Sequence, residues 1–494
     1  MLTVKDIIWL TFLSSILTTA NARKCKAVPG TPSWPSDSAW TTLNNTISGA
    51  LIKSVPPGGV CHPGQPNYNN NSCAAVAELW TSSWDFYEDD PVGNAFNNWN
   101  NDTCLPDPQL PCSDVGYPVY VINASIPEHV QAGINFAREN NVRLIVKSSG
   151  HDFLGRSVAP YSLSIWTHNL LGLSHHETFQ QQCHEKNDPE PYNGPAITMA
   201  TGEDQGSAFA FANQYNLMIN VAGHASIGFG GYVTGGGHSL LSFQKGLAAD
   251  GILEMSVVLP SGEIVTANAC QNRDLFWALR GGGGSTFGVI LNFTTKAWPS
   301  EPVTEYIFGF GSPTLNTVKF WDAMTYMAAQ FPAIINGGAM CYGNIVPGSS
   351  TSSPSFGGSF QAPNMNAAQT AALLDPIATH INAMFAPDVI AVTSSIEWSS
   401  YYDWWIHNQD TTTPMGIDVA IGSRILDEKA LNHPNFSSIV QGAMGPEGLD
   451  LIVVGGPGTH AFEEDFNAVS PAWRTGYVHA GSYEILPFEL DMLS

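Results

Sequence analysis

The sequence predicts an α+β protein of two domains, and three features support this. The chain has 494 residues, of which 44% are hydrophobic, which is enough for two domains with sizeable cores. The apolar run at residues 142–146, rich in β-branched residues, is typical of a strand, and residues 257–265 are typical of a hairpin with its turn at Pro260-Ser261-Gly262. Residues 315–330 and 367–385 carry apolar side chains at helical spacing. Glycine-rich motifs stop after Trp298-Pro299, which places the domain boundary there.

The first 22 residues have the composition of a secretory signal peptide. An apolar run follows Lys5 and ends in small residues at Ala22, and it is shorter than the roughly 20 residues that span a bilayer. We therefore expect cleavage after Ala22, no membrane anchor, and a protein that is secreted or held in the lumen of the secretory pathway.

Residues 23–116 are predicted to form a polar, loop-rich, cysteine-containing N-terminal arm. Five of the eight cysteines lie in it, and an oxidising compartment would pair several of them. The shortest loops favour Cys61 with Cys73 and Cys104 with Cys112, although eight cysteines allow about 105 pairings. No cysteine has metal-ligand spacing. Six N-x-Ser/Thr sequons predict a glycoprotein: Asn44, Asn70, Asn101, Asn123, Asn292 and Asn435.

The charge balance excludes one class of partner. The formal charge is −24 with only 18 Lys and Arg residues, and no basic stripe is interleaved with aromatic residues. Nucleic acid is therefore not an expected partner.

The strand at residues 142–146 is followed by a loop suited to a ligand. Gly150 and Gly155 permit backbone conformations in which successive N–H groups converge on an anion such as a pyrophosphate. His151 adds an imidazole nitrogen, which is a nucleophile when neutral. Taken alone, such a loop is more often a solvated surface turn.

A second glycine-rich stretch, residues 221–238, strengthens the ligand hypothesis. Gly228 and Gly230 begin a G-x-G that suggests a dinucleotide fold, with Asp250 at the distance of a ribose contact. That match fails because Val233 stands where the third glycine should be. Three more glycines, residues 235–237, lie where a helix should already be running.

Together the two stretches resemble the flavin oxidoreductases of the vanillyl-alcohol oxidase and berberine bridge enzyme type. Residues 246–250, 257–265 and 274–290 extend the resemblance. It implies an FAD-binding domain of two α+β subdomains over residues 117–299. An α/β substrate domain with a sheet covering the flavin would follow over residues 300–480. Residues 481–494 form a tail that is atypical of the family.

The resemblance also implies the cofactor site. The loop around His151 would bind the FAD pyrophosphate, with the histidine attached to the 8α-methyl of the isoalloxazine ring; a histidine that only hydrogen-bonds the cofactor is the alternative. The implied FAD-binding residues are Ser148, Ser149, Gly150, His151, Asp152, Gly155, Arg156, Ser157, Gly223, His224, Ser226, Ile227, Gly228, Gly230, Gly231, Gly236, Gly237 and Val289.

Two positions depart from the family pattern. Berberine bridge enzymes form a second flavin bond from a cysteine at the position of His224, so we expect a single covalent link through His151, with His224 as a hydrogen-bonding neighbour or a base. Ile227 occupies a position that influences oxygen access in the family. The electron acceptor, molecular oxygen or another, therefore stays open.

The catalytic base has no counterpart in the sequence. Family members continue beyond the segment resembling residues 469–474 to a Tyr-x-Asn base. Tyr68-Asn69-Asn70 and Tyr342-Gly343-Asn344 match that pattern in the wrong parts of the chain, and we treat both as coincidence. We favour a shortened chain over a substitute base or a poor catalyst.

The implied reaction is a two-electron oxidation with hydride transfer to flavin N5. The favoured substrate is an alcohol or amine carbon of a small, fairly apolar molecule in fungal secondary metabolism, of polyketide or alkaloid type such as the ergot alkaloids. A carbohydrate oxidase and a catalytically impaired flavin-binding remnant are the alternatives. An aromatic cluster could line the substrate pocket, but we favour packing for it: Trp398, Tyr401, Tyr402, Trp404 and Trp405.

Overall fold

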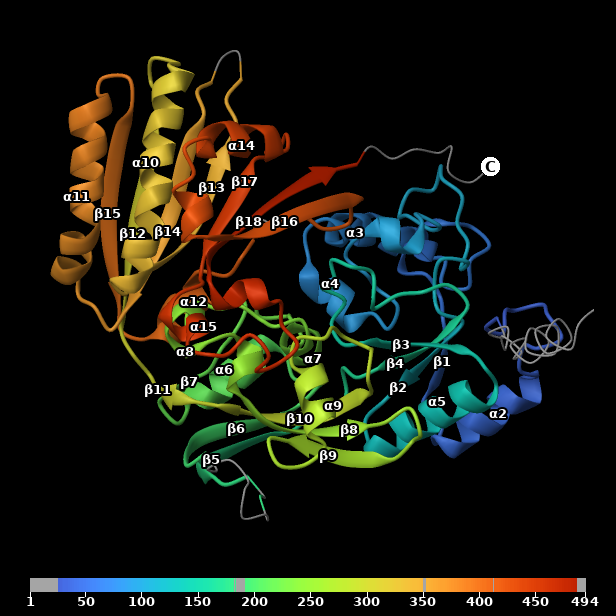
Figure 1. Cartoon of the computed structure of the whole chain (residues 1–494). Coiled ribbons are helices and arrows are strands. Elements are labelled where there is room, and N and C mark those ends of the chain that lie inside the picture. The colour runs from blue at the N-terminus through green and yellow to red at the C-terminus, as the bar shows by residue number, and fades with distance from the viewer. Residues whose placement is uncertain (1–24, 182, 184–191, 350–351, 412, 487–494) are drawn as a thin grey trace, which may run out of the picture.

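The computed structural model describes residues 25–181, 183, 192–349, 352–411 and 413–486 (Figure 1). The signal peptide predicted over residues 1–22 lies outside these ranges. Sheets of four, five and seven strands form the architecture, together with one two-stranded pair. Two mixed α and β subdomains and a larger sheet with helices behind it confirm the predicted fold class.

The four-stranded sheet has the order β1-β2-β4-β3. Helix α5 (Pro127–Glu139) connects β2 to β3, and both of these strands run parallel to β4. Part of the predicted N-terminal arm belongs to this subdomain, because β1 pairs with β2 and Trp40 of α2 (Asp37–Thr46) packs on Phe136 with ring centroids 4.5 Å apart. The strands are β1 (Leu51–Lys53), β2 (Tyr120–Asn123), β3 (Arg143–Lys147) and β4 (Ser162–Trp166).

The rest of the arm is held by the two predicted disulfides, Cys61–Cys73 and Cys104–Cys112, both of which the structure confirms. Its short helices are η1 (Pro57–Cys61), α3 (Asn70–Trp80), α4 (Trp84–Asp89) and η2 (Asn97–Asn100). A third disulfide, Cys183–Cys270, was not foreseen; it joins the segment after β5 to the segment after β9.

The five-stranded antiparallel sheet has the order β5-β6-β10-β8-β9 and contains the predicted hairpin as β8 and β9. Its strands are β5 (Leu173–Phe179), β6 (Gly194–Ala200), β8 (Ile252–Val258), β9 (Ile264–Asn268) and β10 (Val289–Lys296). The short pair β7 (Leu217–Met218) and β11 (Trp298–Pro299) lies at the exit to the third sheet. The helices are α6 (Gln205–Asn213), α7 (Phe229–Thr234), α8 (Ser242–Lys245), η3 (Ala248–Gly251) and α9 (Arg273–Leu279).

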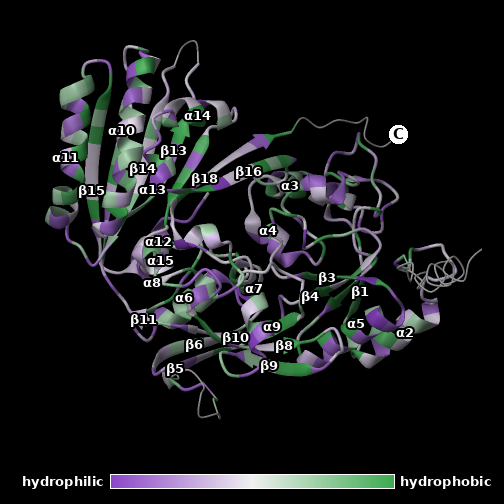
Figure 2. Cartoon of the chain, viewed as in Figure 1, coloured by the Kyte–Doolittle hydropathy of each residue, from purple (hydrophilic) through white to green (hydrophobic). Residues whose placement is uncertain are grey.

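The seven-stranded sheet is antiparallel, in the order β15-β12-β14-β13-β17-β18-β16. Helices α10 (Thr317–Asn336) and α11 (Ala367–Phe385) cover one face, and bands of hydrophobic and hydrophilic residues alternate along both (Figure 2). Both helices were predicted. The strands are β12 (Val303–Gly311), β13 (Met340–Val346), β14 (Ser355–Pro363), β15 (Ile390–Trp398), β16 (Val419–Asp427), β17 (Leu449–Val453) and β18 (Gly476–Ile485). The remaining helices are α12 (Tyr401–His407), α13 (Glu428–Leu431), α14 (Phe436–Ala443), α15 (Pro457–His460) and η4 (Pro471–Arg474).

Two sequence expectations bear on the third sheet and its surroundings. The tail expected from residue 481 begins inside β18, because residues 481–485 continue the pairing with β16. The aromatic cluster packs as favoured: Tyr401, Trp404 and Trp405 are buried, and Trp405 lies against Phe209 of α6 with ring centroids 5.4 Å apart. The domain boundaries themselves stay predictions.

A buried ion pair joins the two halves of the molecule. Arg474 of η4 donates to both carboxylate oxygens of Asp250 in η3, at 2.9 and 3.0 Å, and both side chains are almost fully buried. Asn467 also contacts both partners. Asp250 therefore binds the chain that leads into β18, and it is not free to serve the ribose contact considered above.

Across the ranges that the structure describes, no helix combines the length and apolar character needed to cross a membrane.

Candidate active site

The Asp152 carboxylate holds the loop after β3 in shape through hydrogen bonds to backbone N–H groups of the same loop. Asp152 accepts hydrogen bonds from the backbone N–H groups of Leu154 and Ser157, at 2.9 and 3.0 Å. Gly150 has a φ of +90°, and a Cβ there would lie 2.9 Å from the carbonyl oxygen of Gly93. Glycine is therefore required at Gly150, and the Asp152 side chain shapes the loop.

The second glycine stretch packs directly on this loop. The N–H of Gly228 donates to Ser149 Oγ at 2.9 Å, and a side chain at Gly228 would collide with Ser148. At Gly231, by contrast, no atom lies within 4 Å of the position a Cβ would take. The two loops thus form a closely fitted pair with open space beside them, which fits a flat cofactor such as FAD.

His151 lies where the two loops meet. Its Nε2 is 2.8 Å from Ser226 Oγ, which is in turn 2.9 Å from Nδ1 of His224. Burial lowers the pKa of His151 well below its usual value, and His224 and Lys147 lower it further. The imidazole of His151 is therefore neutral at physiological pH, the form in which its nitrogen is a nucleophile.

Trp84 is a neighbour of His151 that the sequence did not reveal. Its indole stacks on the imidazole with ring centroids 4.0 Å apart and an angle of 11° between the planes. Trp84 belongs to α4 in the N-terminal arm, and no local pattern links it to the loop. Lys147 anchors this helix, because its buried Nζ donates to the carbonyl oxygens of Tyr87 and Glu88, at 2.9 and 3.3 Å.

Burial also shifts the pKa values of Lys147 and of the neighbouring Glu88. It lowers the pKa of Lys147 to about 8 and raises the pKa of Glu88 to about 8, the latter with help from Asp204 and Asp85. Both groups therefore titrate close to physiological pH.

Other predicted cofactor residues surround the same loops. Arg156 lies against Gly283, where a Cβ would collide with the guanidinium, and it supplies a positive charge that suits a phosphate. Ser157 Oγ accepts a hydrogen bond from Asn94 at 3.2 Å. Gly223 is bound through its carbonyl oxygen by the N–H of Asp410 at 2.8 Å.

The remaining predicted residues have mainly structural contacts. Ile227 accepts a hydrogen bond at its carbonyl oxygen from the N–H of Gln205 at 3.0 Å, and Gly230 accepts one from Thr234 Oγ1 at 2.7 Å. Gly236 and Gly237 accept from the N–H groups of Ala249 and Ala248, at 2.9 and 2.8 Å. Val289 is buried in β10 within the core between the first two sheets. A cofactor contact from Val289 would have to come from its backbone.

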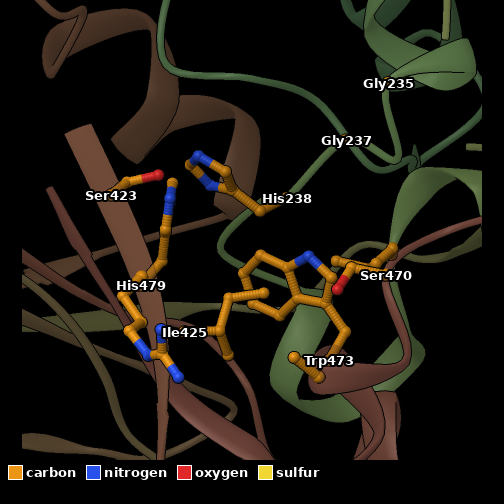
Figure 3. Close-up of a pocket in the computed structure, with 11 residues that line it drawn as sticks. Gly235, Gly237, His238, Ser423, Ile425, Ser470, Trp473 and His479 are labelled. Atoms are coloured by element: carbon orange, nitrogen blue, oxygen red, sulfur yellow. The ribbon is translucent and has the colours of Figure 1, made fainter. Parts of the chain in front are cut away.

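A cavity of about 450 Å³ lies between the second glycine loop and the seven-stranded sheet (Figure 3). His238 and Trp473 face Ser423 and Ile425 of β16 across it. The lining residues are Gly235, Gly237, His238, Leu247, Ser423, Arg424, Ile425, Ser470, Ala472, Trp473 and His479. Of the predicted cofactor residues, Gly237 lines this cavity.

Two histidines of the cavity lining, His238 and His479, lie close together, and Tyr342 contacts the first of them. Burial, together with the neighbouring His479, lowers the pKa of His238 to about 4. Tyr342 of β13 has its hydroxyl 3.4 Å from His238 Nδ1, and the rings of His238 and His479 are 6.4 Å apart. Among the described residues, the buried Nδ1 of His479 has no hydrogen-bond partner, which suits a ligand. The Tyr342 motif was expected to be a coincidence and neither histidine was predicted, because only tertiary packing brings these three side chains together.

This arrangement is that of a two-domain FAD-binding protein with a cavity under a separate sheet, and the comparisons agree. Residues 118–268 match the family model described as FAD binding domain. The FAD-linked oxidoreductase patO of Aspergillus clavatus is 31% identical over 460 residues, which cover 92% of this chain and 77% of that protein. The bifunctional decalin synthase calF of Penicillium decumbens is 32% identical over 484 residues, covering 94% and 80%.

Solved structures give the same result. The VAO-type flavoprotein MtVAO615 from Myceliophthora thermophila C1 superposes with a TM-score of 0.82 at 29% identity, covering 95% of this chain and 84% of that one. Berberine bridge enzyme shares the fold, with a TM-score of 0.59 at 14% identity over 90% and 80% of the chains. The chain belongs to the FAD-linked oxidoreductases of the vanillyl-alcohol oxidase and berberine bridge enzyme type, as the sequence resemblance predicted.

Proposed function

We propose that this oxidoreductase carries FAD on a single covalent bond to His151 and oxidises an alcohol or amine carbon of a small, fairly apolar molecule. The observation that carries the first part is the neutral His151 imidazole at the junction of the two glycine loops. When bound, FAD supplies a two-electron acceptor at N5. The loops around His151 would hold it, and Arg156 would balance phosphate charge.

The single bond follows from His224. This residue stands where the related enzymes with a second flavin bond have a cysteine, and an imidazole lacks the thiolate that makes that bond. His224 is hydrogen-bonded to Ser226 through Nδ1. This contact supports a role for His224 as a hydrogen-bonding neighbour of the cofactor site and not as a second attachment point.

The cavity supports a small substrate, because its volume of about 450 Å³ falls in the range of small-molecule pockets. Its lining is mixed: Leu247, Ile425 and Trp473 contribute apolar surface, beside polar groups that include Ser423, Arg424 and the two histidines. The sequence similarity to calF of Penicillium decumbens, which is named a bifunctional decalin synthase, supports a role for this oxidoreductase in fungal secondary metabolism. A polyketide or an alkaloid of ergot type would fit this chemistry.

The proton released on oxidation would be accepted by the histidines of the cavity. The lowered pKa of His238 keeps it neutral at physiological pH, and burial also lowers the pKa of His479. Tyr342 has a pKa raised by burial, so its O–H can donate to His238 Nδ1 and orient the ring.

Two experiments test this proposal. Mass spectrometry of flavin-bearing peptides from the purified protein is expected to find FAD on His151 alone; a flavin on any other residue contradicts the tether. Anaerobic bleaching of the flavin absorbance is then measured with a panel of alcohols, amines and sugars. Bleaching by apolar alcohols or amines supports the assignment, and preferential bleaching by sugars favours a carbohydrate oxidase. A flavin that no compound bleaches favours the non-catalytic remnant.

We also propose that the protein matures in the secretory pathway as a glycoprotein. Three disulfides support an oxidising compartment. Asn70, Asn101 and Asn435 are exposed sequons, whereas Asn123 and Asn292 are half-buried within β2 and β10. Glycans are therefore expected on the first three, and peptide mapping of secreted protein would locate them.

A further inference from the structure

The hydroxyl of Ser226 lies between two imidazole rings. Ser226 Oγ is 2.8 Å from Nε2 of His151 and 2.9 Å from Nδ1 of His224. Both distances are those of good hydrogen bonds. The three side chains therefore form one continuous hydrogen-bonded chain from the second glycine loop to the first.

The direction of these hydrogen bonds follows from a third one. The backbone N–H of Ser226 donates to Nδ1 of His224 at 3.2 Å, so this nitrogen carries a lone pair and no proton. The Ser226 O–H then also donates to His224 Nδ1, and Ser226 Oγ accepts the N–H of His151 Nε2. Because a neutral imidazole has only one N–H, the free lone pair of His151 is on Nδ1.

The surroundings keep this order in place. Burial lowers the pKa of both histidines, so both rings are neutral at physiological pH. Stacking on Trp84 fixes the plane of the His151 ring. The carboxylates of Asp85 and Asp410 partly offset the lowering of the pKa of His224 by burial. A positive charge is therefore better tolerated on the His224 ring than on the His151 ring.

We propose that Ser226 and His224 form a proton relay that activates His151 Nδ1 for its own attachment to FAD. This inference rests on the proposed function, in which His151 carries the cofactor. It gives His224 a task of its own at this position.

The proposed step balances as follows. A bond forms between His151 Nδ1 and the 8α carbon of FAD, and one C–H bond of the 8α-methyl breaks, with its proton released. The electron pair of that C–H bond remains on the ring, which is left two-electron reduced and is reoxidised by dioxygen with formation of hydrogen peroxide. The alkylated His151 loses its Nε2 proton to Ser226 Oγ as the Ser226 hydroxyl proton moves to His224 Nδ1.

The test measures the rate of attachment without using substrate turnover. Apoprotein is mixed with FAD, and flavin that survives denaturation is followed over time by gel fluorescence. Ser226→Ala and His224→Asn are expected to slow attachment about a hundredfold, the order of one general base. Asn can still accept hydrogen bonds near the Nδ1 position, but it cannot take up a proton.

Two controls separate the relay from a loss of folding. Ser226→Thr keeps the hydroxyl and is expected to attach FAD within about threefold of the wild-type rate, on the reasoning that a relay needs only that group. His433→Ala, at an exposed histidine before α14, should match wild type. Non-covalent FAD binding, measured by fluorescence quenching, reports folding of the site in each variant.

The outcomes distinguish the two proposals. Wild-type attachment rates in both Ser226→Ala and His224→Asn would overturn the relay while the tether stands. The relay is equally overturned if these variants slow attachment only in proportion to weaker FAD binding, or if Ser226→Thr is as slow as Ser226→Ala. Covalent flavin persisting in His151→Ala would instead overturn the tether, and with it the proposed function.

Discussion

The two halves of the molecule present their functional residues in opposite ways. In the FAD-binding half, the candidate residues other than Val289 lie in two contiguous loops, residues 148–157 and 223–237, which pack on each other through Ser149 and Gly228. In the substrate half, single side chains from β16, β18 and η4 converge on one cavity. Substitutions on the substrate side can therefore change what is bound without disturbing the cofactor loops.

The halves nevertheless share several contacts, and one of them is the buried ion pair of Arg474 with Asp250. Removing this ion pair tests whether the two halves are independent. Of the substitutions considered, it is expected to lower stability the most. Arg474→Met leaves the Asp250 carboxylate buried without its charged partner, which should lower the free energy of unfolding by about 3–5 kcal/mol. Denaturant unfolding would measure this. Lys319→Met, which removes an exposed ion pair with Asp322, is the control and should cost less than about 1 kcal/mol.

The Cys183–Cys270 disulfide lies within the FAD-binding half alone. Cys270→Ser is expected to destabilise the protein by about 2–4 kcal/mol, because the bridge closes a long loop of the unfolded chain. Calorimetry would record the change as a lower melting temperature. Cys25→Ser, at an exposed free cysteine, should leave the transition where it is. Equal shifts in both variants would contradict a structural role for the bridge.

Glu88 gives the FAD-binding half a dependence on pH. Its pKa is raised from 4.5 to about 8 by burial, so between these values the folded chain holds a proton that the unfolded chain releases. The contribution of this group to stability is present below pH 4.5 and is lost as the pH rises to 8. The Glu88→Gln variant has no carboxyl group to ionise, so it does not lose this contribution as the pH rises. The free energy of unfolding of the variant minus that of wild type should therefore increase by about 1–2 kcal/mol between pH 5 and pH 8.

Melting curves of both proteins across this pH range check the Glu88 prediction. Glu78→Gln, on the exposed face of α3, is the matched control. A constant difference between Glu88→Gln and wild type at every pH would refute it.

The smallest effect is expected at Ile425, in the substrate half. Ile425→Ala enlarges the cavity and should lower kcat/KM for an apolar substrate about tenfold, while the flavin spectrum stays unchanged. Ile421→Ala, on the same face of β16 but 46% exposed, should leave kinetics unchanged. A change of the flavin spectrum in Ile425→Ala would show that the two halves are not separable in this way.

Much of the fold could be predicted because it depends on local patterns. Helical spacing located α10 and α11, and the turn around Gly262 located the β8–β9 hairpin. Two disulfides closed short loops and were predictable for that reason. The third was not, because Cys183 and Cys270 are 87 residues apart and sheet pairing alone brings them together.

The residues of the candidate site also fall into those that local sequence predicts and those that only long-range packing brings together. The sequence by itself determined the two glycine loops, the candidate tether His151 and the presence of His224 where related enzymes with a second flavin bond have a cysteine, since each depends on residues adjacent in the chain. Only the tertiary structure decided that Trp84 stacks on His151, that Ser226 bridges two histidines, and that Tyr342 meets His238. The physical reason is that side-chain chemistry acts over a few ångströms, and the path of the backbone decides which residues come that close.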